Sequence, residues 1–143
     1  MSADGPKPTV LISDRQFRPL DEAGLRELAE RTLIGEGRAA SELSVSFVQE
    51  EEIADLHQRY MHEEGPTDVL SFRLEEVADG VAILGDVVIA PEVAARNNPD
   101  VEAELRLLLV HGILHLLGHD HEDEAERAVM WERQERYTGM RVP

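Results

Sequence analysis

Residues 101–117, VEAELRLLLVHGILHLL, form an apolar segment that constrains the fold of this chain more than any other stretch. A helix that is apolar on nearly all sides belongs in the middle of a small protein, where neighbouring elements cover every face. The segment is shorter than the roughly 20 apolar residues that cross a bilayer. We therefore expect a buried central helix with the other elements arranged around it.

The other elements are predicted from apolar periodicity and from residues that start or stop helices. An Asp79-Gly80 turn separates the last two expected strands. The last expected helix is amphipathic, with Ala125, Val129 and either Trp131 or Glu132 marking its turns. The expected strands are residues 9–14, 41–49, 67–74 and 84–90, and the further helices are residues 22–37, 50–61, 91–98 and 123–137. This order predicts an α+β or α/β sandwich with one mixed sheet, and it leaves the strand order open.

Composition narrows both the class of protein and the kind of metal site. The 143 residues, 42% hydrophobic and 31% charged, suit one globular domain over residues 1–143. No run is long enough to cross a membrane and the first residues do not resemble a secretion signal, so we expect a cytoplasmic protein. The chain has no cysteine, so any metal must be held by histidine, carboxylate or water.

The charge balance argues against binding of nucleic acid through a broad basic surface. The formal net charge is −16, from 30 acidic residues against thirteen arginines and the single lysine Lys7. A small arginine-lined phosphate site is still compatible with this balance, because net charge describes the far field and not one cleft.

Residues 111–121, HGILHLLGHDH, contain three histidines with the spacing of a metal site. In a helix, His111 and His115 lie one turn apart on one face, so their imidazoles can reach a common point. Gly118 is well placed to end that helix in a left-handed conformation, after which His121 can approach from the loop. Three nitrogens leave a fourth tetrahedral position for water, as in catalytic zinc sites. We predict one Zn²⁺ ion per chain on His111, His115 and His121, which are also the predicted catalytic residues.

The residues of this segment also have possible roles other than metal binding. Histidines that are hydrogen-bonded in the core or placed near a helix C-terminus are the structural alternative. We expect His119 to be exposed to solvent. Asp120 could orient an imidazole, or it could be an ordinary loop acid. Gly112 stands where the His-Glu-x-x-His helix of metalloproteases carries its glutamate general base, which argues against peptide hydrolysis.

The histidine segment resembles the H-G-x-L-H-L-x-G-Y-D-H signature of the YbeY family, bacterial metal-dependent endoribonucleases linked to rRNA maturation. Three further segments are similar to parts of that family, so the resemblance covers about residues 40–137: PTDVLSF (66–72), LGDVVIAPEVA (84–94) and MWERQERY (130–137). The resemblance implies a small α+β domain with one four-stranded mixed sheet flanked by helices. The metal site would lie on the central helix and the loop that follows it.

The same resemblance implies cleavage of single-stranded RNA, with a role in 16S rRNA 3′-end maturation and in ribosome quality control. The implied partners are rRNA and the ribosomal small subunit or its proteins. The PTDVLSF strand would line the same cleft, which makes Ser71 and Arg73 candidate substrate contacts. The family often has an arginine where this chain has Met61, and Arg59 and Arg73 are both candidates to take its place. Ordinary solvated arginines are the alternative for Arg59 and Arg73. At position 119 the family usually has tyrosine, and we expect His119 to be tolerated there.

Our leading hypothesis for the mechanism is that the zinc ion polarises a phosphodiester oxygen and activates a water that attacks phosphorus. Asp68, Asp86 and Asp120 are candidates for the general base, each with a structural alternative. Nickel or another divalent ion would also suit imidazole ligands. Two other classes stay open: a metalloprotease-like or small-molecule metallohydrolase, and a ribosome-associated factor whose metal is structural.

Overall fold

The computed structural model describes residues 6–61, 67–119 and 123–139, and in these residues five helices pack on one four-stranded sheet. The strands are β1 (Thr9–Arg15), β2 (Ser41–Val48), β3 (Val69–Ala78) and β4 (Val81–Ile89). The helices are α1 (Glu22–Gly35), α2 (Glu50–Met61), α3 (Pro91–Asn97), α4 (Val101–Leu116) and α5 (Glu124–Thr138). Every predicted element is present, and the prediction of an α+β fold is confirmed.

The sheet has the order β1-β2-β4-β3, which the sequence did not predict. β1, β2 and β4 are parallel, and β3 runs antiparallel to β4, so the expected mixed four-stranded sheet is confirmed. The predicted turn joins β3 to β4, and both Asp79 and Gly80 have positive φ, 53° and 78°. Two successive positive φ angles are what a tight type I′ hairpin turn requires.

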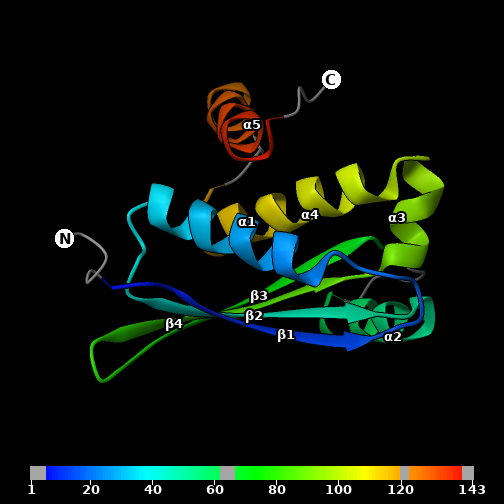
Figure 1. Ribbon diagram of the computed structural model, residues 1–143, viewed down its shortest axis with the longest axis horizontal. Helices are drawn as coiled ribbons and strands as arrows, with labels where there is room; N and C mark the ends of the chain where they lie inside the picture. The colour runs from blue at the N-terminus through cyan, green and yellow to red at the C-terminus, as the bar shows by residue number, and fades with distance from the viewer. Residues whose placement is uncertain (1–5, 62–66, 120–122, 140–143) are drawn as a thin grey trace.

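The helices form layers on both sides of the sheet, and α4 lies in the middle of the thicker side. Figure 1 shows α1 and α4 above the sheet, α2 on the opposite face, and α5 across the outer side of α1 and α4. α4 contacts β3, β4, α1, α3 and α5. Its Val110, Ile113 and Leu114 are 0% exposed, as predicted for a helix that is apolar all round.

Aspartates begin three of the helices, and their side chains satisfy backbone N–H groups that have no partner inside the helix. These are Asp21 for α1, Asp100 for α4 and Asp123 for α5. None of the helices in the part of the chain that the structure describes is long and apolar enough to span a membrane.

The predicted apolar face of α5 is wrong. Ala125 and Val129 are exposed, and the buried residues of this helix are Met130, Gln134 and Tyr137. Two of these three carry polar groups. They can be buried because Gln134 hydrogen-bonds to His111 of α4 and Tyr137 to Glu36, the residue after α1. Apolar periodicity does not reveal a buried face of this composition.

Candidate metal centre

α4 brings two of the three predicted metal ligands together. The rings of His111 and His115 have centroids 5.2 Å apart with 62° between their planes, and both residues are half-buried. The third predicted ligand, His121, and the candidate Asp120 lie outside the described residues. Within the described residues there is no group of three side chains that could hold a metal ion.

Gln134 of α5 is a hydrogen-bond partner of the His111 ring. The Nδ1 atom of His111 lies 2.7 Å from Oε1 of Gln134, whose residue is 2% exposed. An amide oxygen only accepts hydrogen bonds, so Nδ1 is the donor in this pair, and in the neutral ring the lone pair is then on Nε2. Histidines that bind metals commonly donate the proton of the other ring nitrogen in this way. The chemistry of this pair therefore fits a divalent ion.

Gly118 ends the helix that carries the pair, as predicted. It has a φ of 100°, in the left-handed region. The N–H of His119 donates to the carbonyl of Leu114 at 3.0 Å, and the N–H of Gly118 donates to the carbonyl of His115 at 3.1 Å. Arg73 of β3 donates from Nη2 to the same His115 carbonyl at 3.0 Å. A cation is favourable at a helix C-terminus, because the helix dipole places partial negative charge on the last carbonyl groups.

Gly112 lets α4 approach the sheet closely. Ser71 of β3 donates from Oγ to the Gly112 carbonyl at 3.1 Å. A Cβ atom at Gly112 would lie 2.6 Å from Cγ1 of Val87, closer than carbon atoms pack. The glutamate that metalloproteases carry at this position does not fit unless the helix moves.

The other predicted polar residues lie away from this pair or have structural partners. Arg59 is on α2, which covers the opposite face of the sheet (Figure 1), and its side chain pairs with Asp55 at 3.5 Å. Asp86 alternates with Val87, which faces α4, so Asp86 points to the other face. Asp68 accepts a hydrogen bond from Asn97 of α3 at 3.1 Å.

The family model described as Endoribonuclease YbeY matches residues 11–140. The chain belongs to this family. A protein from Thermobifida fusca named Endoribonuclease YbeY is 46% identical, over 88% of this chain and 89% of that protein. One of the same name from Acidothermus cellulolyticus is 42% identical, over 94% and 92%. The solution structure of TM1509 from Thermotoga maritima has the same fold, with a TM-score of 0.59 and 30% identity over 91% of this chain and 87% of that one.

Membership of the YbeY family confirms the resemblance that the histidine segment indicated, and it directs attention to position 119, where the signature has tyrosine. The prediction that His119 is exposed is wrong, because its side chain is 22% exposed and Nε2 lies 2.9 Å from Oε1 of Glu36. Both tyrosine and histidine can donate a hydrogen bond to a carboxylate. The departure from the YbeY signature therefore conserves a donor at this position.

Glu36, the residue after α1, is a buried carboxylate that the sequence analysis did not single out. Its side chain is 5% exposed, and Oε2 accepts from the Tyr137 hydroxyl at 2.6 Å and from Nη1 of Arg133 at 2.8 Å. Burial by itself would raise the pKa of Glu36, but the hydrogen bonds from Tyr137, His119 and Arg133 outweigh burial and lower the pKa below its usual value. In turn, burial and Glu36 raise the pKa of Tyr137.

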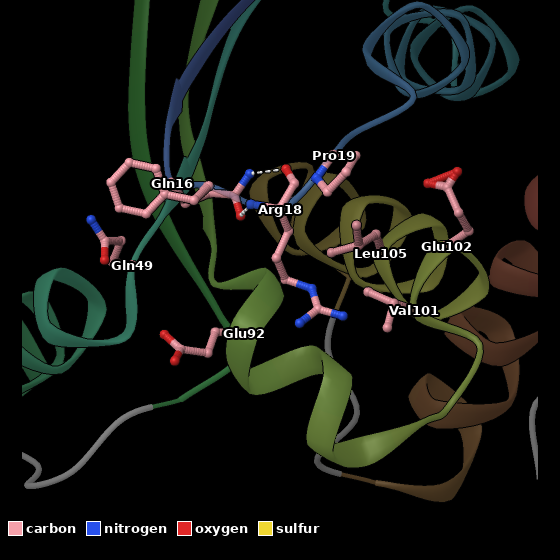
Figure 2. Close-up of a pocket in the computed structure, with 9 residues that line it drawn as sticks. Gln16, Arg18, Pro19, Gln49, Glu92, Val101, Glu102 and Leu105 are labelled. Carbon is pink, nitrogen blue, oxygen red and sulfur yellow. Dashed lines mark hydrogen bonds between the residues drawn. The ribbon is translucent and has the colours of Figure 1, made fainter.

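A cavity of about 540 Å³ lies at the other end of α4 from the histidine pair. It opens beside the segments that follow β1, β2 and β4, and Figure 2 shows Arg18 reaching into the space between α3 and α4. Val101 lines it, ten residues before His111, which is about 15 Å along a helix. The cavity has no histidine, and beside Arg18 it is lined by the carboxylates of Glu92 and Glu102, so it offers none of the predicted metal ligands.

Proposed function

We propose that this protein is a zinc-dependent endoribonuclease that cleaves single-stranded RNA in the maturation of the 16S rRNA 3′ end and in ribosome quality control. Family membership supports the endoribonuclease activity and the role in rRNA processing, because this is a family of endoribonucleases, which are hydrolases that act on RNA. The zinc site is supported chiefly by the hydrogen bond between Nδ1 of His111 and Oε1 of Gln134, which favours the tautomer that metal-binding histidines use, one turn from His115.

The proposed ligands of one zinc ion are His111, His115 and His121. A bound zinc ion supplies a Lewis acid that polarises the phosphodiester and activates water. By accepting a hydrogen bond from Nδ1 of His111, Gln134 favours the tautomer of the neutral imidazole that a metal needs. A neutral His115, one turn further along α4, presents a second nitrogen.

Ser71, Arg73 and Arg59 are the proposed substrate contacts. Arg73 and Ser71 hold α4 against β3, so both lie close to the histidine pair. A guanidinium group has five N–H donors, and contact with the His115 carbonyl is therefore compatible with contact to a phosphate. Arg59 would have to act from α2, on the other side of the sheet.

The ribosomal small subunit or its proteins are the proposed partners, in the cytoplasm, and residues 1–143 are the proposed catalytic domain. The net charge of −16 supports this assignment, because a chain with this charge attracts free RNA poorly and benefits from a partner that delivers the substrate.

The function is tested with wild type, His115→Ala and His57→Ala, each assayed with zinc on an unstructured RNA and on casein. We expect RNA cleavage by wild type to be lost at least about 100-fold in His115→Ala, because metal polarisation contributes several kcal/mol to the rate. His57→Ala, on α2, is the matched control and should retain activity. Casein cleavage without RNA cleavage would favour the metallohydrolase class. Unfolding on removal of zinc would indicate a structural metal.

A further inference from the structure

The Glu36 carboxylate joins three parts of the chain that are far apart in sequence. It follows α1, it binds Arg133 and Tyr137 of α5, and it binds His119 in the turn after α4. With a side chain that is 5% exposed, it makes these hydrogen bonds with little competition from water. A carboxylate accepts from all three donors at once, whereas an amide has only one accepting oxygen.

The packing around Tyr137 fits this arrangement. Gly35 is the last residue of α1, and a Cβ atom there would lie 2.5 Å from Cε1 of the Tyr137 ring. The absence of a side chain at Gly35 therefore provides the space through which the ring reaches Glu36. Arg31 of α1 also donates to the Tyr137 carbonyl at 2.9 Å, so α1 holds this part of α5 through both main chain and side chain.

The two α5 residues that bind Glu36 lie on either side of Gln134 in the sequence. Arg133 comes one residue before Gln134 and Tyr137 three residues after it, which places all of them within about one helical turn. By binding Arg133 and Tyr137, Glu36 therefore fixes the rotation of α5 about its axis, and its position along that axis, at Gln134. Gln134 in turn accepts the hydrogen bond from Nδ1 of His111.

We propose that Glu36 is a positioning residue for the metal centre: by holding Arg133, Tyr137 and His119, its carboxylate keeps Oε1 of Gln134 against Nδ1 of His111. This inference rests on the metal site of the proposed function, and it adds a residue outside the histidine segment on which metal affinity depends. The alternative is that the cluster only stabilises the packing of α5 and has no specific effect on the metal.

The test compares zinc affinity of purified wild type and Glu36→Gln by competition with a chromophoric chelator. We expect Glu36→Gln to bind zinc about 10- to 100-fold more weakly, which is the usual cost of losing the partners that orient a metal-binding histidine. In nitrogen-15 spectra of the metal-free protein, we expect the hydrogen-bonded Nδ1–H signal of His111 to disappear in this variant. Tyr137→Phe, which removes one donor and keeps the ring, should give a smaller loss and serves if Glu36→Gln does not fold.

Two controls separate positioning from general stability. Val45→Ala, in the core strand β2, destabilises the fold at a distance and should leave both zinc affinity and the Nδ1–H signal unchanged below its melting temperature. His119→Tyr keeps a donor for Glu36 and should bind zinc within about threefold of wild type, whereas His119→Phe, which cannot donate, should bind more weakly. A threefold change in zinc affinity is clearly smaller than the roughly 10- to 100-fold loss expected when an orienting partner is removed.

Wild-type affinity in Glu36→Gln, or an equal loss in Val45→Ala, would overturn this inference and leave the proposed function intact. A wild-type protein that binds no zinc would overturn the metal site itself, and this inference with it.

Discussion

Glu36 should make the stability of the protein depend on pH in the acid range. Its pKa is lowered in the folded state, so its contribution is complete above the unfolded pKa of about 4.3 and is lost as the pH falls through the folded pKa. At pH 7 we expect Glu36→Gln to lose about 2 kcal/mol of unfolding free energy, in the range of hydrogen bonds to charged groups. Urea unfolding of metal-free protein, followed through Trp131 fluorescence, should show that this difference shrinks below about pH 4.

The control for this measurement is Glu27→Gln, an exposed carboxylate on α1 that pairs with Arg31 at 3.6 Å. An exposed pair of this kind contributes about 0.5 kcal/mol at most, so its difference from wild type should be small at every pH. A difference between wild type and Glu36→Gln that grows on acidification would contradict the lowered pKa.

The histidine pair could be predicted from the sequence, but its partners could not. His111 and His115 are recognisable because helical geometry turns a spacing of four into a shared face. Gln134 and Glu36 have no such local signature, since their partners lie 23 and 83 to 101 positions away. Gln134 lies in the MWERQERY segment that indicated the family, and this was the one available signal. Glu36 is one of 30 acidic residues, and only the fold distinguishes it from the others.

The contact between α4 and the sheet depends on Gly112, and we expect Gly112→Ala to destabilise the protein by about 1–2 kcal/mol. Overpacking of a full core costs about 1–3 kcal/mol, and the better helix propensity of alanine returns at most about 1 kcal/mol. Val87, which the new Cβ would meet, is 0% exposed and has little freedom to move. Urea unfolding measures the difference. In the double variant Gly112→Ala with Val87→Ala, the clash should disappear, so the two changes should be non-additive. A gain in stability in the single variant would contradict the tight contact.

The helices and strands followed from local patterns, and their arrangement did not. The aspartate caps, the Asp79-Gly80 turn and Gly118 each act within a few residues, so the sequence shows where elements begin and end. The position of β4 between β2 and β3 depends on contacts between distant strands. The buried face of α5 was mispredicted for the same reason: Gln134 and Tyr137 are buried by partners on α4 and α1.

At the scale of the whole molecule, the histidine pair on α4 contrasts with the strongly acidic composition of the chain. α4 runs through its centre and connects the layers, so the histidine pair is supported by β3 on one side and α5 on the other. The donors near the pair are local, whereas the charge of −16 is spread over the chain. Under the proposed function, short-range contacts with these donors would favour a phosphate at the pair, and long-range electrostatics would oppose its arrival.

This opposition predicts how cleavage of free RNA responds to salt. We expect kcat/KM on a short single-stranded RNA to stay constant or to rise as KCl increases, because the Debye length falls from about 30 Å at 0.01 M to about 8 Å at 0.15 M and screens the repulsion. An enzyme that holds RNA through many basic contacts shows the reverse, a steep fall with salt. The matched comparison is the double variant Glu27→Lys with Glu51→Lys, at two exposed positions on α1 and α2. This variant should cleave faster than wild type at low salt, and its kcat/KM should rise less, or fall, as KCl increases. Efficient cleavage of naked RNA by wild type with a steep decrease on adding salt would contradict both this prediction and the need for a ribosomal partner.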